Sequence, residues 1–159
     1  MELQKLEVVH LAKSSADKLY RLCTRDAPQL PKYVPEVVLN VEVIGEGPGG
    51  EIILGTVFVW TFIPVGGSAI VSKVQVTAVD NKKRSITWTV LEGDIAKDFK
   101  SFNFDLDITP KPGATDGTSM VKWSVEYEKA NEDVPDPVGT VTACGLLTTI
   151  LDLRLQKQA

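Results

Sequence analysis

Residues 134–158 read VPDPVGTVTACGLLTTILDLRLQKQ, and this stretch predicts the helix around which the chain folds. Asp136 is suited to cap the helix, and Pro137 is suited to its first position. No charged residue lies between Asp136 and Asp152, so the first half of the helix needs cover on most sides. About 20 residues at about 1.5 Å each give a helix roughly 30 Å long, enough to cross a small domain.

The chain before this helix alternates apolar and polar residues and predicts β-strands. A short helix is expected first, capped near Ser14 and running to Cys23, and Pro28, Pro31 and Pro35 divide the next segment into short turns. The strands are expected at residues 6–11, 37–44, 55–63, 68–79, 84–91, 100–108 and 119–127. Consecutive strands with short turns favour an antiparallel sheet, and the fold class is therefore α+β.

Length and composition indicate one globular domain, residues 1–159, with 43% hydrophobic and 24% charged residues. The net charge of −4 argues against nucleic-acid binding, which favours a basic surface, and against anionic membranes. The N-terminus has no secretory pattern, and the uncharged run of the last helix is shorter than the about 20 residues of a membrane span. Cys23 and Cys144 fit no metal or redox spacing, so we expect free thiols, no metal, no cofactor and a cytoplasmic protein.

Large aromatic side chains share one face of the predicted sheet. A packed core explains such a face, and so does the lining of a cavity for a flat apolar ligand. Because a single helix has to cover so wide a sheet, we expect a cavity with the helix as its floor. The expected ligand-binding residues are Phe58, Trp60, Phe62, Ile70, Ser72, Val74, Trp88, Phe102, Phe104, Trp123, Tyr127, Val141 and Gly145. Among the polar groups, Ser72, Tyr127 and His10 are expected to orient the ligand.

Several motifs together resemble plant major latex proteins of the Bet v 1-like superfamily. The most specific are WSVEYEK at residues 123–129 and NEDVPDP at residues 131–137, and the resemblance covers nearly the whole chain. It implies a helix-grip fold: a seven-stranded antiparallel sheet wrapped around the long C-terminal helix, two short helices and a large hydrophobic cavity. It also implies binding of a small hydrophobic plant metabolite or hormone, such as an alkaloid, steroid or flavonoid, as a carrier or in defence. The sequence departs from the family by an insertion at residues 51–54 and by the uncharged helix.

An enzyme of alkaloid biosynthesis, an isomerase, lyase or cyclase, is the alternative that the resemblance leaves open. Norcoclaurine synthases share the fold and use an inward tyrosine, glutamate, lysine and aspartate. The corresponding residues here are Ser72, Val74, Ile86 and Phe104, which makes that condensation improbable. His10, the single histidine, shares a strand face with Leu6 and Val8 and is the candidate catalytic base, although the pattern favours a hydrogen-bonded or exposed histidine without a catalytic role.

Two further patterns concern the glycines and the outer faces. The glycine-rich stretch 45–50 leads into Glu51 and a strand, whereas a phosphate-binding loop ends in Gly-Lys-Ser/Thr before a helix, so we interpret it as a turn. Leu147 and Leu151 are expected to fall partly outside one apolar helix stripe. Apolar residues are also expected on outward strand faces, at Val9, Leu11, Val57, Val59 and Val71. Such exposed apolar area predicts a homodimer.

Overall fold

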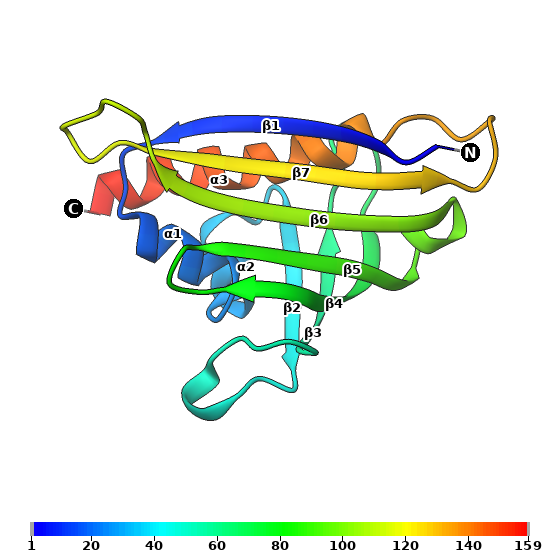
Figure 1. The fold of residues 1–159 in the computed structure, drawn as a ribbon, viewed down its shortest axis with the longest axis horizontal. Helices are drawn as coiled ribbons and strands as arrows, with labels where there is room; N and C mark the ends of the chain where they lie inside the picture. Colours follow the sequence, from blue (N-terminus) through cyan, green and yellow to red (C-terminus); the bar gives the residue numbers. More distant parts are fainter. Residues whose placement is uncertain (1, 159) are drawn as a thin grey trace.

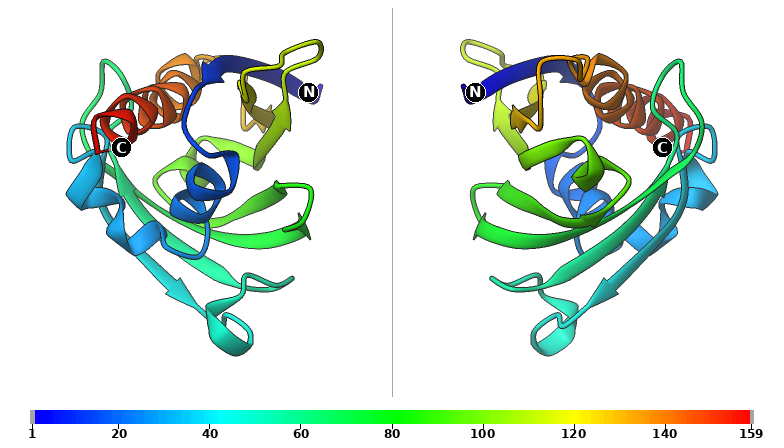
Figure 2. Two further views of the ribbon diagram at one scale, coloured as in Figure 1. Left: turned by 90° about the vertical axis from the view of Figure 1, so that its left-hand side faces the viewer. Right: turned by 90° about the vertical axis from the view of Figure 1, so that its right-hand side faces the viewer.

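The computed structural model describes residues 2–158 as one antiparallel sheet that curves around a long helix (Figures 1 and 2). The seven strands are β1 Gln4–Ala12, β2 Val38–Ile44, β3 Val57–Phe62, β4 Ile70–Asp80, β5 Ser85–Gly93, β6 Phe99–Pro110 and β7 Ser119–Lys129. The helices are α1 Ala16–Cys23, α2 Leu30–Tyr33 and α3 Val138–Gln158, with short 3-10 turns at Ala27–Gln29, Pro48–Gly50 and Ile95–Lys97. The α+β fold predicted from the sequence is confirmed.

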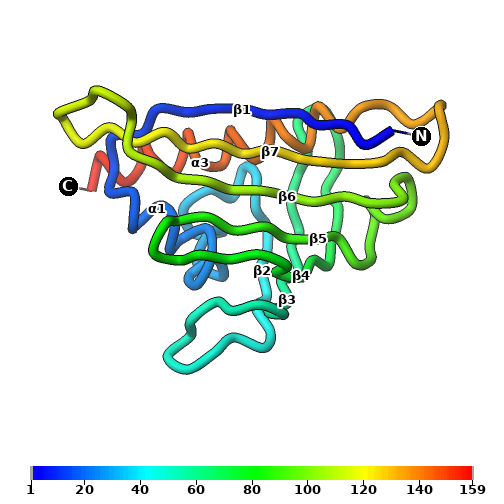
Figure 3. Tube along the Cα trace, viewed as in Figure 1, coloured from blue at the N-terminus to red at the C-terminus, as the bar shows by residue number. Residues whose placement is uncertain are grey.

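The strand order β1-β7-β6-β5-β4-β3-β2 brings the first strand beside the last. Each neighbouring pair is antiparallel, and the trace in Figure 3 shows the β2–β3 connection projecting beyond the rest of the sheet. In β6, buried side chains alternate with exposed or half-buried ones, because successive residues of a strand point to opposite faces. The buried face is the concave one, toward α1 and α3.

The helix α3 packs mainly along β1 and β7. Gly145 permits this close approach, since a Cβ atom there would lie 3.0 Å from Cγ2 of Val8. Near the other end, the Arg154 guanidinium donates to Glu36 and to the carbonyl oxygen of Tyr33, which ties α3 to the α2 segment. These contacts stabilise a helix whose threonines and glycines make it a poor helix former on its own.

Two expectations about α3 are wrong. Asp136 does not cap the helix, because its carboxylate instead accepts hydrogen bonds from Tyr127 Oη at 2.9 Å and from Lys129 Nζ at 2.9 Å. The Lys129 bond and then the Tyr127 bond hold the pKa of Asp136 below its usual range. Leu147 and Leu151 are buried, since β1, β7 and α1 all contact α3 and widen its buried stripe.

Gly93 is required where β5 meets β4 beside Ser72. Its φ is +113°, and a Cβ atom there would lie 2.4 Å from the carbonyl oxygen of Val71. We expect Gly93→Ala to lower the free energy of unfolding by at least about 2 kcal/mol, because the backbone has to move to admit the methyl group. Gly66→Ala is the matched control: φ is +82° there and no atom lies within 4 Å of the added Cβ. Urea denaturation should show a loss of about 1 kcal/mol for this control, and equal losses in the two variants would contradict the steric argument.

Candidate ligand cavity

An apolar cavity of about 50 Å³ lies between α3 and the concave face of the sheet. Strands β3 to β7 each contribute at least one side chain, and the segment that enters β2 closes one side. The lining residues are Val37, Val38, Trp60, Phe62, Ser72, Val74, Trp88, Phe104, Trp123, Ala143, Cys144 and Leu147. Trp60 and Cys144 are half-buried and the other lining residues are buried, so the cavity comes nearest the surface between β3 and α3.

The sequence predicts part of this lining. The structure brings together Trp60, Phe62, Ser72, Val74, Trp88, Phe104 and Trp123 at the cavity. It places the other expected residues elsewhere: Phe58, Ile70, Phe102, Tyr127, Val141 and Gly145. Sequence reasoning missed Val37, Val38, Ala143, Cys144 and Leu147. The spacing of Ala143 and Leu147, one helical turn apart, was the available signal for the helix residues.

The expectation of a large cavity is wrong, because tryptophan and phenylalanine rings fill most of the space. Trp88 stacks on Trp123 with ring centroids 6.0 Å apart, and Trp60 meets Trp88 edge-on at 6.1 Å. Phe58 packs against both Trp60 and Trp88. Pockets for drug-sized ligands hold about 300–1,000 Å³, so a metabolite of that size fits here only if these side chains move.

Tyr127, which was expected to orient the ligand, lies outside the cavity lining and belongs to a second aromatic group. Its ring packs against Phe99 and Phe102, with centroids 5.6 and 6.0 Å away. Its hydroxyl donates to Asp136 and lies 3.3 Å from Gln4 Oε1. Burial, followed by the Asp136 hydrogen bond, raises the pKa of Tyr127 to about 12. The phenol therefore links β7 to the start of α3.

Three polar atoms of the lining have no hydrogen-bond partner within residues 2–158: Ser72 Oγ, Trp88 Nε1 and Trp123 Nε1. Ser72 is 1% exposed, Trp88 2% and Trp123 4%. Most buried polar groups in folded proteins are hydrogen-bonded, and a buried group left without a partner destabilises the fold. All three atoms belong to side chains that line the otherwise apolar cavity.

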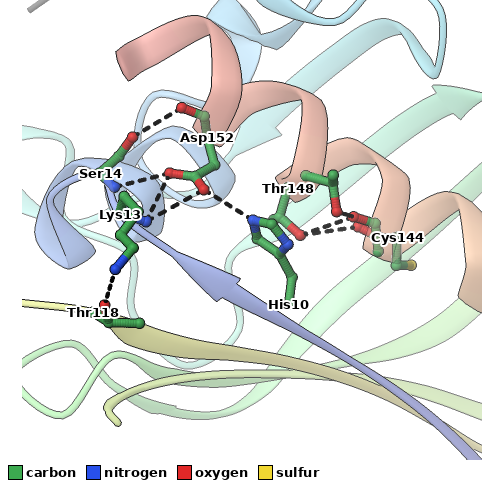
Figure 4. Close-up of polar contacts among 9 residues, drawn as sticks. His10, Lys13, Ser14, Thr118, Cys144, Thr148 and Asp152 are labelled. Carbon is green, nitrogen blue, oxygen red and sulfur yellow. Dashed lines mark hydrogen bonds and ion pairs between the residues drawn. The ribbon is translucent and has the colours of Figure 1, made fainter. Parts of the chain in front are cut away.

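His10 lies outside the cavity lining and joins the carboxylate of Asp152 (Figure 4). The side chain of Asp152 is 2% exposed, and its oxygens accept from Ser14 N at 2.8 Å and from Lys13 N at 3.2 Å. His10 Nε2 lies 2.9 Å from Oδ2, and an ionised carboxylate only accepts, so Nε2 carries the proton. This position gives His10 a structural contact between β1 and α3.

The pKa of Asp152 lies below its usual range. Burial acts in the opposite direction and is the largest single influence, but the hydrogen bonds from His10, Ser14 and Lys13 together outweigh it. The carboxylate is therefore ionised at neutral pH and holds the segment between β1 and α1 against the C-terminal half of α3 (Figure 4).

A second, open cleft of about 380 Å³ lies between α1 and the glycine-rich loop. It is lined by Asp17, Tyr20, Arg21, Thr24, Arg25, Pro48, Gly49, Glu51, Ile52 and Asn81. The Tyr20 hydroxyl donates to Asn81, and the Asn81 amide donates to the carbonyl oxygen of Ile52. The buried polar groups of this cleft thus already have partners, and its charges have both signs.

Two other kinds of feature bear on residues 2–158: a metal centre and a membrane-spanning helix. Side chains of the ligand types do not gather into a metal-binding group there. By length and composition α3 is the one helix in this range able to cross a membrane, but buried core helices meet the same criterion. Here α3 packs against the sheet.

A curved seven-stranded antiparallel sheet closed by a long C-terminal helix over an apolar cavity defines a helix-grip protein. Residues 1–158 match the pathogenesis-related protein Bet v 1 family. The chain is 34% identical to MLP-like protein 43 of Arabidopsis thaliana over 151 residues, which cover 95% of this chain and 92% of that relative. It belongs to the Bet v 1 family and, within it, to the major latex protein-like group.

Two more relatives agree with this assignment. MLP-like protein 28 of Arabidopsis thaliana is 33% identical over 151 residues, and the chain spans 95% of its own length but 43% of that longer relative. The crystal structure of ginseng major latex-like protein 151 from Panax ginseng superimposes with a TM-score of 0.82 at 27% identity. That superposition covers 96% of this chain and 97% of the ginseng chain. The family resemblance inferred from the sequence is confirmed.

Proposed function

We propose that the protein binds a small hydrophobic molecule in the cavity between α3 and the sheet. The observation that supports this proposal is a cavity lining of aromatic and aliphatic side chains, without a charged residue, enclosed between the sheet and one helix. Ligand binding is typical of the family. The metabolite classes implied by the sequence resemblance, alkaloids, steroids and flavonoids, are the proposed ligands, and a cytoplasmic carrier in defence or stress is the proposed role.

Binding requires the cavity to widen. Trp60 and Cys144 are the half-buried lining residues, so we propose that the entrance opens between β3 and α3 as the Trp60 ring moves. A ligand that buries about 300 Å² of apolar surface at about 25 cal/mol per Å² gains about 7.5 kcal/mol. A Kd of about 1 µM corresponds to about 8 kcal/mol. The cost of moving side chains lowers the gain, so affinity is expected in the micromolar range or weaker.

The lining favours carriage over turnover. Among the described residues that line the cavity, Cys144 is the one titratable side chain, and burial raises the pKa of its thiol to about 12. Acid–base catalysis works best with a group whose pKa lies near the working pH. His10 is engaged with Asp152 outside the lining, so the alternative of an isomerase, lyase or cyclase lacks a base at the ligand.

The test is a titration with N-phenyl-1-naphthylamine, a neutral apolar dye, followed by dye fluorescence. We expect micromolar binding to the wild type and an altered Kd in Trp60→Ala, Trp88→Ala and Trp123→Ala, because each indole borders the cavity. Val71→Ala is the matched control: Val71 is an exposed residue next to Ser72 on β4, and its removal should leave the Kd unchanged. Unchanged binding in all three tryptophan variants would place the dye elsewhere and contradict the proposal.

Self-association stays a prediction. Val9, Leu11 and Val71 are exposed, as are Leu146 and Leu153 on α3, whereas Val57 and Val59 are half-buried. We propose a symmetric homodimer that covers part of this apolar surface. Light scattering at micromolar concentration should give about twice the chain mass of 17.3 kDa. A mass near 17.3 kDa would show a monomer and end this proposal.

A further inference from the structure

We infer that the ligand of the cavity is a neutral molecule that presents an acceptor oxygen to the two buried indole N–H groups. This inference rests on the proposed function and specifies the chemistry of the ligand. Its evidence is separate from the apolar lining: Ser72 Oγ, Trp88 Nε1 and Trp123 Nε1 are buried without a partner in residues 2–158, and all three residues line one cavity.

The two indoles lie together. Trp88 on β5 and Trp123 on β7 both border β6, and their rings are nearly parallel, at 13°, with centroids 6.0 Å apart. Ser72, the third residue with a buried polar atom that has no partner, lies on β4. An indole N–H only donates, whereas a hydroxyl donates and accepts. Two indole donors without a partner therefore belong to residues that line the cavity, and the one side-chain oxygen of the lining, Ser72 Oγ, accepts from neither of them.

The lining also restricts the charge of the ligand. A cation would face indole donors with no carboxylate in the lining, and an anion would be buried without an arginine or lysine. Burying an unpaired charge is far more costly than burying a hydrogen-bonded neutral group. A flat apolar skeleton with a ketone, lactone or ether oxygen satisfies the donors and keeps the apolar contacts.

Indane and 1-indanone separate this inference from simple apolar binding, because they differ by the exchange of one CH₂ group for a carbonyl group. In a purely apolar cavity the carbonyl loses its water hydrogen bonds, and indane binds more tightly. With the indole donors we expect the opposite order, with 1-indanone about tenfold tighter, the equivalent of one neutral hydrogen bond. The readout is the Kd of each compound from titration of tryptophan fluorescence.

Substitution locates the donors. Trp88→Phe combined with Trp123→Phe removes both N–H groups and should reverse the order, so that indane binds more tightly. Trp60→Phe is the matched control, since it also removes an indole from the lining but not one of the buried unpartnered donors, and it should keep the preference for 1-indanone.

A ¹H–¹⁵N NMR spectrum of the wild-type protein provides a test that does not depend on whether the double variant folds. The indole ¹H–¹⁵N resonances of Trp88 and Trp123 should move downfield with 1-indanone and not with indane. If both compounds bind but indane binds as tightly or more tightly, the inference is overturned and the proposed function stands. If neither compound binds while the dye titration succeeds, the inference is overturned and the proposed function stands; if the dye titration fails as well, both are overturned.

Discussion

Replacing Asp152 with alanine is expected to lower the free energy of unfolding by about 3–5 kcal/mol, the cost of breaking a buried charged contact. Three donors lose their acceptor together: the backbone amides of Lys13 and Ser14 and the His10 ring. The contact joins residues more than 130 positions apart, so it has no local substitute. Urea denaturation followed by circular dichroism measures the loss.

Asp17→Ala is the matched control for this prediction. Asp17 pairs with Arg84 at 2.8 Å, but its side chain is 71% exposed, so its removal should cost less than about 1 kcal/mol. A loss of similar size in the two variants would show that the burial and the backbone hydrogen bonds of Asp152 are not what stabilises α3.

The contribution of Asp152 also has a defined pH dependence. Its carboxyl pKa is lower in the folded protein than the usual value of about 4, so the folded state favours the ionised form. The stabilisation is therefore complete above about pH 4 and is lost as the pH falls through the lower folded value. The difference in stability between the wild type and Asp152→Asn should accordingly shrink below pH 4, and a constant difference down to acid unfolding would contradict this assignment.

Trp88→Ala is the second substitution expected to have a large effect, with a loss of about 3–5 kcal/mol in the free energy of unfolding. The Trp88 ring contacts Phe58, Trp60 and Trp123, so truncation removes the centre of the aromatic group and leaves a void. Thermal and urea denaturation measure the loss. Leu91→Ala on the same strand is the control, because Leu91 is exposed and its truncation should change stability by less than about 1 kcal/mol.

Much of the fold follows from local patterns in the sequence. The alternation from Phe102 to Ile108 predicts one buried strand face, and the structure buries that face in β6. The start of α3 was harder to predict. Asp136 is a good capping residue by type, but its carboxylate accepts hydrogen bonds from Lys129 and Tyr127 of β7 instead. Tertiary contacts of this kind override a local preference, and they are visible only once β7 and α3 are placed together.

The candidate site was predictable only in part, for a related reason. Strand parity gives the face on which a side chain lies, but the position along the cavity depends on register: Trp123 pairs with Leu106, and Tyr127 pairs with Phe102 farther along. Parity therefore selected both aromatic residues, although only Trp123 borders the cavity. The small size of the cavity and the missing partners of the indole N–H groups depend on side-chain packing, which no periodicity encodes.

A crystal structure of the protein soaked with 1-indanone would show whether the cavity widens to hold a small neutral molecule. We expect ligand density between Trp60, Trp88 and Trp123, a moved Trp60 ring, and the ketone oxygen within hydrogen-bond distance of Nε1 of Trp88 or Trp123. Density confined to the outer surface or to the cleft between α1 and the glycine-rich loop, with the aromatic rings in their present positions, would contradict it.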